Sequence, residues 1–89
     1  MKRREDVYSY YYDWVRRTQP CIVDDDCLGP VAAHHVKTVG SGGVDARNLV
    51  AMCLKHHNQV HTVGRRTFAR TYNLDLSSAA EELYRRYVG

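Results

Sequence analysis

Three cysteines and five histidines stand out in this chain, and one group of them has the character of a structural zinc site. The group contains a close pair, Cys53-x-x-His56, together with Cys21 and Cys27. Thiolate and imidazole ligands complete the tetrahedron of many structural zinc sites. The spacing of Cys21 and Cys27 is wide, so the segment between them has to bulge outward. The alternative is that these are ordinary buried thiols in a reduced protein, where a structural disulfide is not expected.

The remaining histidines form a second candidate site. His57 and His61 are spaced i, i+4, which places both imidazoles on one face of a helix, where they can bind one ion. His56 and His57 are neighbours and point about 100° apart around that helix, so one can serve the zinc and the other a second metal. His34 and His35 face opposite sides of a predicted strand. One of them could join the ion, and the other could act on a nearby water.

The elements that would hold these residues are predicted from hydrophobic periodicity and turn residues. An amphipathic helix is expected from about Arg4 to Arg17, before Pro20, with an apolar stripe of Val7, Tyr11, Trp14 and Val15. A strand is expected over residues 31–39, then a flexible turn at residues 40–43, and an antiparallel second strand over residues 48–52.

Three helices are predicted after this hairpin. The first runs from about Leu54 to Thr62 with Gly64 as its C′ residue, and the second from Arg65 to Tyr72, ended by Asn73. Ser78-Ala79-Ala80-Glu81 has the spacing of a capping box and is expected to open the last helix. The fold class is therefore α+β, in one domain spanning residues 1–89.

Composition limits the range of functions. The chain has 89 residues, and a domain this small benefits from a metal staple. Ten of its thirteen basic residues are arginines, which suit phosphate contact, although solvated helix faces are the alternative for any single arginine pair. No apolar run is long enough to span a bilayer, and no apolar stretch behind the first six residues resembles a signal peptide. We therefore expect a cytoplasmic protein with no membrane partner.

The order and spacing of several segments resemble the HNH (His-Asn-His) endonuclease motif. The segments are Ala33-His34-His35-Val36, the glycine turn, Asn48-Leu49-Val50 and Cys53-Leu54-Lys55-His56-His57-Asn58, within a motif core of about residues 21–62. The resemblance implies a ββα-metal (His-Me finger) core with an N-terminal helix and two short C-terminal helices around it. The histidine set is similar to that of colicin nuclease domains, and the cysteine-bearing flanks to small zinc-containing HNH enzymes of phages and bacteria.

This resemblance also implies a role for each matched residue. His35 corresponds to the general base, and Asn48 to the asparagine that secures the loop and orients that base. The implied ligands of a catalytic divalent ion are His34, His57 and His61, and those of a structural zinc are Cys21, Cys27, Cys53 and His56. Many HNH enzymes have a carboxylate where this chain has His34. An all-imidazole set favours Mn²⁺, Ni²⁺ or Zn²⁺ over Mg²⁺, so the physiological metal stays open.

Contacts with DNA are less well located. Lys37 follows the double histidine and Arg47 precedes Asn48, so both could bind phosphates near the cut, or both could be solvated. Asp45 is either a turn-former or a partner of a histidine. No element able to read base edges is recognisable, so low sequence specificity on double-stranded DNA is the hypothesis.

Other functions compete with this one. The main alternative is a non-catalytic zinc-binding module that contacts nucleic acid or protein. A nuclease toxin with an immunity partner is a third reading, and a hydrolase of small phosphoesters is the weakest. A homodimer or a larger phage or bacterial complex, and nicking or double-strand cleavage, all remain open.

Overall fold

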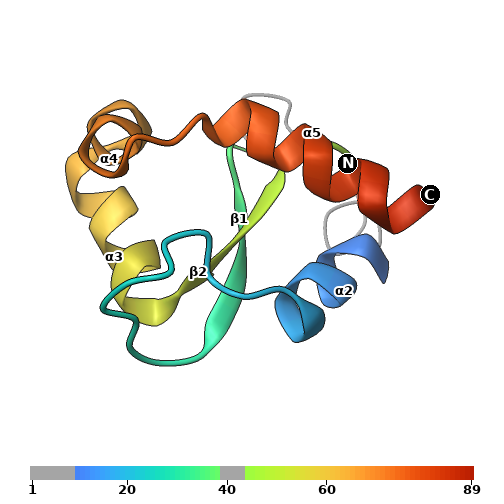
Figure 1. Cartoon of the computed structure of the whole chain (residues 1–89), viewed down its shortest axis with the longest axis horizontal. Helices are drawn as coiled ribbons and strands as arrows, with labels where there is room; N and C mark the ends of the chain where they lie inside the picture. The colour runs from blue at the N-terminus through green and yellow to red at the C-terminus, as the bar shows by residue number, and fades with distance from the viewer. Residues whose placement is uncertain (1–9, 39–43) are drawn as a thin grey trace.

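The computed structural model describes residues 10–38 and 44–89. Its elements are, in chain order, helix α2 (Tyr10–Thr18), strands β1 (Val31–His35) and β2 (Leu49–Cys53), and helices α3 (Leu54–Val63), α4 (Arg65–Tyr72) and α5 (Leu76–Val88) (Figure 1). The expected α+β class is confirmed, with a two-stranded antiparallel sheet. No helix within the described residues is both long and apolar enough to cross a membrane.

The two strands form the centre of the molecule. They pair from Val31 opposite Cys53 to His35 opposite Leu49. All five residues of β2 are buried, because the sheet is covered on both faces. Successive side chains of a strand point to opposite faces, so this register places His34 and His35 on different sides of the sheet.

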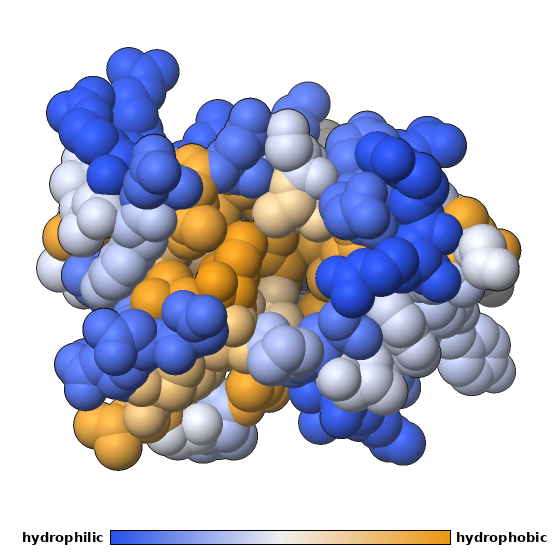
Figure 2. Space-filling model, viewed as in Figure 1, coloured by the Kyte–Doolittle hydropathy of each residue, from blue (hydrophilic) through white to orange (hydrophobic). Residues whose placement is uncertain are grey.

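Two hydrophobic clusters cover the two faces of the sheet. One joins α2 and α5 to the sheet through Tyr11, Val15, Ala33, Leu49, Ala51 and Leu83. The other joins α3, α4 and the start of α5 to the opposite face, and its members include Val50, Met52, Val60, Phe68, Leu76 and Ala80. Figure 2 shows apolar side chains gathered over the middle of the face drawn in Figure 1, with hydrophilic side chains toward its two ends.

Two backbone hydrogen bonds attach the loop between α2 and β1 to the rest of the fold. The Ile22 N–H donates to the Ala51 carbonyl at 2.7 Å, and the Lys55 N–H donates to the Leu28 carbonyl at 3.1 Å. These bonds attach the loop to the outer side of β2 and to the first turn of α3. The acidic residues between them, Asp24 to Asp26, are exposed, so the segment bulges outward as its cysteine spacing requires.

Most predicted boundaries are close to the observed ones. Helix α4 has the predicted ends, and Asn73 after it adopts the left-handed conformation (φ 54°). Helix α3 is one residue longer than expected: it ends at Val63, and Gly64, whose φ is 87°, is its C-cap. Strand β1 is shorter than predicted, because the chain bends after His35 at Val36 and Lys37. The predicted helix residues 4–9, including Val7, together with Val39 and the glycine turn at residues 40–43, lie outside the described residues.

The capping-box prediction for the last helix is wrong. Helix α5 begins at Leu76, and its N-cap is Asp75, whose Oδ1 accepts a hydrogen bond from the Ser78 N–H at 3.0 Å. A carboxylate at the N-cap satisfies a free N–H of the first turn and also favours the positive end of the helix dipole. Leu76 is 5 % exposed, so its burial fixes this earlier start.

Candidate metal centres

The three cysteines and His56 meet beside the N-terminal end of α3. Nδ1 of His56 lies 3.1 Å from Sγ of Cys53, 3.5 Å from Sγ of Cys21 and 3.8 Å from Sγ of Cys27. All four ligand atoms are within 4.8 Å of one another. A tetrahedral zinc ion, with bonds of about 2.3 Å to sulfur and about 2.0 Å to nitrogen, needs S···N separations of roughly 3.5 Å. The four residues therefore form a cluster that could bind a metal ion such as zinc.

The electrostatics of this cluster favour a bound cation. Cys53 is the N-cap of α3. Burial raises the pKa of its thiol, but backbone hydrogen bonds with His56 and Leu28 outweigh burial and lower that pKa to about 6. Burial and the thiols of Cys21 and Cys53 raise the pKa of Cys27 to about 12. The Cys53 thiolate therefore forms readily while Cys27 resists ionisation, and a divalent cation would relieve the repulsion between the two sulfur atoms.

A second cluster lies on another face of the same helix. Nε2 of His57 is 3.1 Å from Nε2 of His61, and the His34 ring centroid lies 5.2 Å and 5.3 Å from the centroids of His57 and His61. One nitrogen from each of the three rings lies within 4.8 Å of the other two. The register of β1 brings His34 to this side of the sheet, and the i, i+4 spacing brings the two helical histidines together.

Two of these histidines, His34 and His57, are held in the neutral form that binds metals. Burial, together with the nearby His57 and His61, lowers the pKa of His34 to about 4. Burial and the neighbouring His61 also lower the pKa of His57. A neutral imidazole offers a free lone pair, and protons compete less with a metal at a nitrogen whose pKa is low.

The low pKa of His34 predicts a pH-dependent loss of stability. Between pH 6.5 and about 4 the unfolded chain binds a proton at His34 that the folded chain does not. The free energy of unfolding of the wild type should therefore fall relative to that of His34→Gln as the pH drops, by about 3 kcal/mol at pH 4. Urea unfolding of protein loaded with one equivalent of zinc measures this difference. Parallel curves for the two proteins would contradict the prediction.

His35 lies on the other face of the sheet, next to α2. Its Nε2 is 2.8 Å from Oδ1 of Asp45, whose residue is 4 % exposed. The Tyr12 ring stacks on the imidazole, with centroids 5.9 Å apart and planes 30° apart. Asp45 combines both of its predicted alternatives, because its carbonyl also accepts a hydrogen bond from the Asn48 N–H in a turn.

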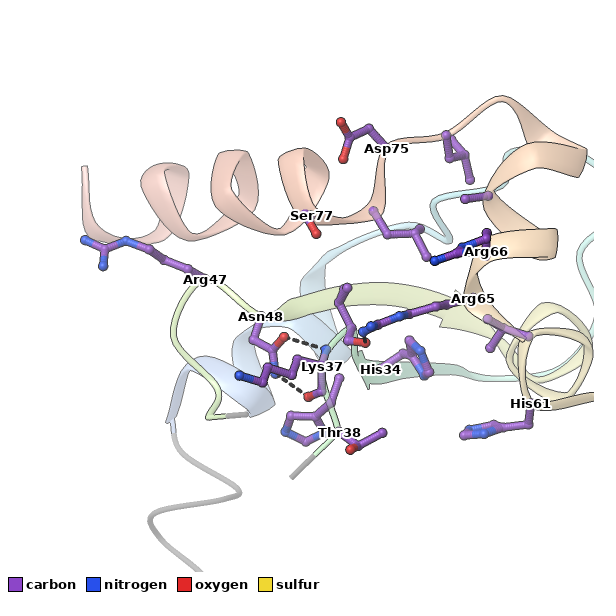
Figure 3. A pocket seen from close by; sticks show the side chains of 16 residues that line it. His34, Lys37, Thr38, Arg47, Asn48, His61, Arg65, Arg66, Asp75 and Ser77 are labelled. Atoms are coloured by element: carbon purple, nitrogen blue, oxygen red, sulfur yellow. Dashed lines mark hydrogen bonds between the residues drawn. The ribbon is translucent and has the colours of Figure 1, made fainter. Parts of the chain in front are cut away.

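Asn48 fastens the segment that follows His35. Its Oδ1 accepts from the Lys37 N–H and its Nδ2 donates to the Lys37 carbonyl, each at 2.8 Å (Figure 3). The Val36 N–H donates to the Asn48 carbonyl, also at 2.8 Å. The amide of Asn48 therefore continues the pairing of the two strands beyond the last residue of β1.

Removing this amide should destabilise the end of the hairpin. Asn48 is 9 % exposed, so Asn48→Ala deletes two hydrogen bonds in a mostly buried place and should lower the free energy of unfolding by about 2 kcal/mol. Urea unfolding with constant zinc measures the loss. Asn58→Ala, at an exposed position of α3, is the matched control and should change stability by less than about 0.5 kcal/mol. Equal effects of the two substitutions would show that the pairing adds nothing.

One open cavity of about 860 Å³ is bordered both by the histidine cluster and by the separate His35. His34 and His61 from the second cluster line it, and so does His35. Its cationic lining consists of Lys37, Arg47, Arg65 and Arg66. The carboxylate of Asp75 also lies on its wall. The excess of positive charge suits an anionic ligand such as a phosphate backbone.

The cationic side chains differ in how they relate to this cavity. Arg65 and Arg66 reach in from α4, and Nη1 of Arg65 donates to the Val36 carbonyl at 2.8 Å (Figure 3). The Arg47 side chain points away from His61 (Figure 3), and its Nε lies 3.9 Å from Oε2 of Glu81 on α5. Lys37 and Arg47 thus both border the cavity, and Arg47 also contacts α5. Arg65 and Arg66 were not singled out from the sequence, where they form one of four arginine pairs.

A comparison with models of protein families, with curated proteins and with solved structures gave no match. The arrangement of the side chains is therefore the basis on which a function is proposed.

Proposed function

We propose that this protein is a metal-dependent DNA endonuclease of the HNH kind, in which β1, β2 and α3 act as the ββα-metal core. The observation that carries the proposal is that three kinds of group line one cavity: two imidazoles of the histidine cluster, the separate histidine His35, and several cations. Phosphodiester hydrolysis requires an activated water, stabilisation of charge on the phosphate and a means of holding the backbone.

His34, His57 and His61 would hold one divalent ion. Their nitrogens lie close enough together to bind a single ion. The lowered pKa values of His34 and His57 keep these two imidazoles neutral and therefore able to bind it. When bound, such an ion neutralises negative charge on the phosphate and on the departing oxygen. A site built from imidazole alone favours Mn²⁺, Ni²⁺ or Zn²⁺ over Mg²⁺.

His35 would act as the general base. It accepts a proton from water, while the water oxygen forms a bond to phosphorus and the bond from phosphorus to the 3′ oxygen breaks. The products are a 5′-phosphate and a 3′-hydroxyl, whose proton comes from solvent. A neutral imidazole has one ring nitrogen with a free lone pair, which can accept this proton. Asn48 would hold the segment after His35 through its two bonds with Lys37.

The cations of the cavity would bind the phosphates on either side of the cut. Lys37 and Arg47 are the two cations expected from the sequence. Arg65 and Arg66 line the same cavity and would bind phosphates with them. Contacts with phosphates position a nucleic acid without reading its sequence. We therefore expect cleavage of double-stranded DNA with low sequence specificity.

The Cys3His cluster would hold a structural zinc at the junction of β2 and α3. It supports one further candidate function, a zinc-binding module without catalysis, because that cluster is geometrically complete by itself. The two functions differ in metal content. A nuclease binds a second ion at the histidine cluster, whereas the module binds one zinc tightly and leaves the histidines without a ligand.

An end-labelled linear DNA duplex tests the proposal. Zinc-loaded protein should cut it when Mn²⁺ or Ni²⁺ is added, and the fragments should carry 5′-phosphates and 3′-hydroxyls at many positions. A single cleavage position would overturn the low specificity while retaining the nuclease. Intact duplex with every metal, beside a measured content of one zinc, would favour the zinc-binding module.

A further inference from the structure

Asp45 stands out as a buried carboxylate that neither metal cluster uses. It is 4 % exposed, and its Oδ1 lies 2.8 Å from Nε2 of His35. Burying a carboxylate is costly unless it is paired and hydrogen-bonded, so its place beside one particular ring nitrogen is a constraint on that ring. Neither Asp45 nor the side of His35 that it contacts belongs to the histidine cluster around His57 and His61.

We propose that Asp45 is a positioning residue that fixes His35 in the Nε2–H tautomer and so leaves Nδ1 as the nitrogen that accepts the proton of water. This inference rests on the proposed nuclease function. A carboxylate can only accept hydrogen bonds, and therefore a ring nitrogen at 2.8 Å from it carries the hydrogen. In a neutral imidazole the other nitrogen then holds the free lone pair.

The surroundings fix the ring in two further ways. The Tyr12 ring stacks on the imidazole at 30° and restricts rotation of its plane, while Asp45 fixes its orientation within that plane. Asp45 itself is held by the turn in which its carbonyl accepts from the Asn48 N–H at 3.1 Å. The Asn48 side chain in turn forms two hydrogen bonds with the backbone of Lys37, two residues after His35. One connected set of hydrogen bonds therefore holds both the proposed base, His35, and its partner, Asp45.

A carboxylate in this place has a second effect on the reaction. When His35 takes the proton of water at Nδ1, the imidazolium that forms carries a positive charge beside Asp45. The negative carboxylate stabilises that charge, as carboxylates do in other carboxylate–histidine pairs. Asp45 would thus speed the proton transfer without touching DNA or the ion, and its loss should lower kcat rather than raise KM.

The test uses full-length, zinc-loaded protein and two variants of this residue. Asp45→Asn keeps the size of the side chain, so it protects the experiment against loss of the fold, and Asp45→Ala removes the partner of His35 completely. Asp13→Asn, which changes a half-exposed carboxylate of α2 paired with Arg16, is the matched control. Long-range ¹H–¹⁵N NMR spectra report the tautomer of His35 before any second metal is added, and plasmid-cleavage kinetics with Mn²⁺ report kcat and KM.

The expected result is an Nε2–H tautomer in the wild type and in Asp13→Asn. In the Asp45 variants the share of that tautomer should fall, and kcat should fall with it by about 10- to 100-fold at unchanged KM, the range typical when a functional histidine loses the carboxylate that orients it. A tautomer that does not change in either Asp45 variant overturns the inference. So does a kcat that is unchanged where the tautomer is lost.

The same experiments distinguish failure of the proposed nuclease function from failure of the positioning role of Asp45. If His35→Ala is inactive but Asp45→Ala cuts like the wild type, the nuclease and its base stand and the positioning role of Asp45 is wrong. If the wild type does not cut DNA with any of the added metals, the nuclease function fails and the catalytic role of Asp45 fails with it. In that case the NMR spectra still decide whether Asp45 sets the tautomer of His35.

Discussion

Replacing His35 with alanine should reduce DNA cleavage by about 10²- to 10⁴-fold, the usual contribution of a general base. The substitution removes the group that takes the proton from water but leaves both metal clusters intact, since His35 belongs to neither. The initial rate of nicking of a supercoiled plasmid, with Mn²⁺ in excess, measures the effect. The variant should keep its zinc and its circular dichroism spectrum.

Ser77→Ala is a suitable control for this substitution. Ser77 also lines the cavity, at the start of α5, but has no role in the proposed chemistry. Its removal should leave the nicking rate within a factor of about two of the wild type, since it deletes only a surface hydroxyl. If His35→Ala and Ser77→Ala cut equally well, His35 is not the base, whatever the metal dependence of the wild type.

Alanine substitutions of the neighbours His56 and His57 should affect different metal sites and therefore different properties of the protein. His56 is 1 % exposed and belongs to the Cys3His cluster, so His56→Ala should release zinc and unfold a domain this small. The apparent binding free energy of a structural zinc is roughly 10 kcal/mol or more, which exceeds the stability of most domains of this size. His57→Ala should keep the zinc and the fold but lose the second ion and, with it, DNA cleavage.

Three measurements distinguish these two variants. The zinc content of the purified protein, its thermal unfolding, and titration with Mn²⁺ or Ni²⁺ should separate loss of the first cluster from loss of the second. A folded His56→Ala protein that retains one zinc would show that His56 is not a required ligand. A His57→Ala protein that binds the second ion as tightly as the wild type would remove His57 from the histidine site.

Much of the local structure could be predicted because it depends on residues close together in the chain. Gly64 and Asn73 have positive φ angles of 87° and 54°, and both mark helix ends correctly because these two residue types tolerate such angles best. The i, i+4 spacing of His57 and His61, and the alternation of His34 and His35, translate directly into faces of a helix and a strand. The histidine cluster follows from these two periodicities and one hairpin.

The errors and omissions arise where packing between distant segments decides. Asp75 rather than Ser78 caps α5, because burial of Leu76 starts the helix earlier than the capping-box spacing indicates. Arg65 reaches the Val36 carbonyl only because α4 packs back toward the end of β1. No periodicity in the sequence distinguishes this arginine from those in the other pairs.

The pairing of Asp45 with His35 lies between these two cases. Its sequence position allows a turn or a histidine partner, and both depend on how the chain returns from β1 to β2. The left-handed φ of 57° at Arg47, within the same turn, is a strained angle for a residue with a side chain. Such strain is maintained by surrounding contacts, here the bonds of Asn48 with Lys37 and Val36.

The most direct test of the central claim is cleavage of supercoiled plasmid by the purified protein after loosely bound metal has been removed. One equivalent of zinc is retained, and Mn²⁺, Ni²⁺, Mg²⁺ and further Zn²⁺ are added in separate reactions, each beside a reaction with chelator. The account predicts conversion to nicked or linear DNA that depends on the added ion, with Mn²⁺ or Ni²⁺ more effective than Mg²⁺. Plasmid that stays supercoiled with every ion, in folded protein that binds DNA and one zinc, would contradict it.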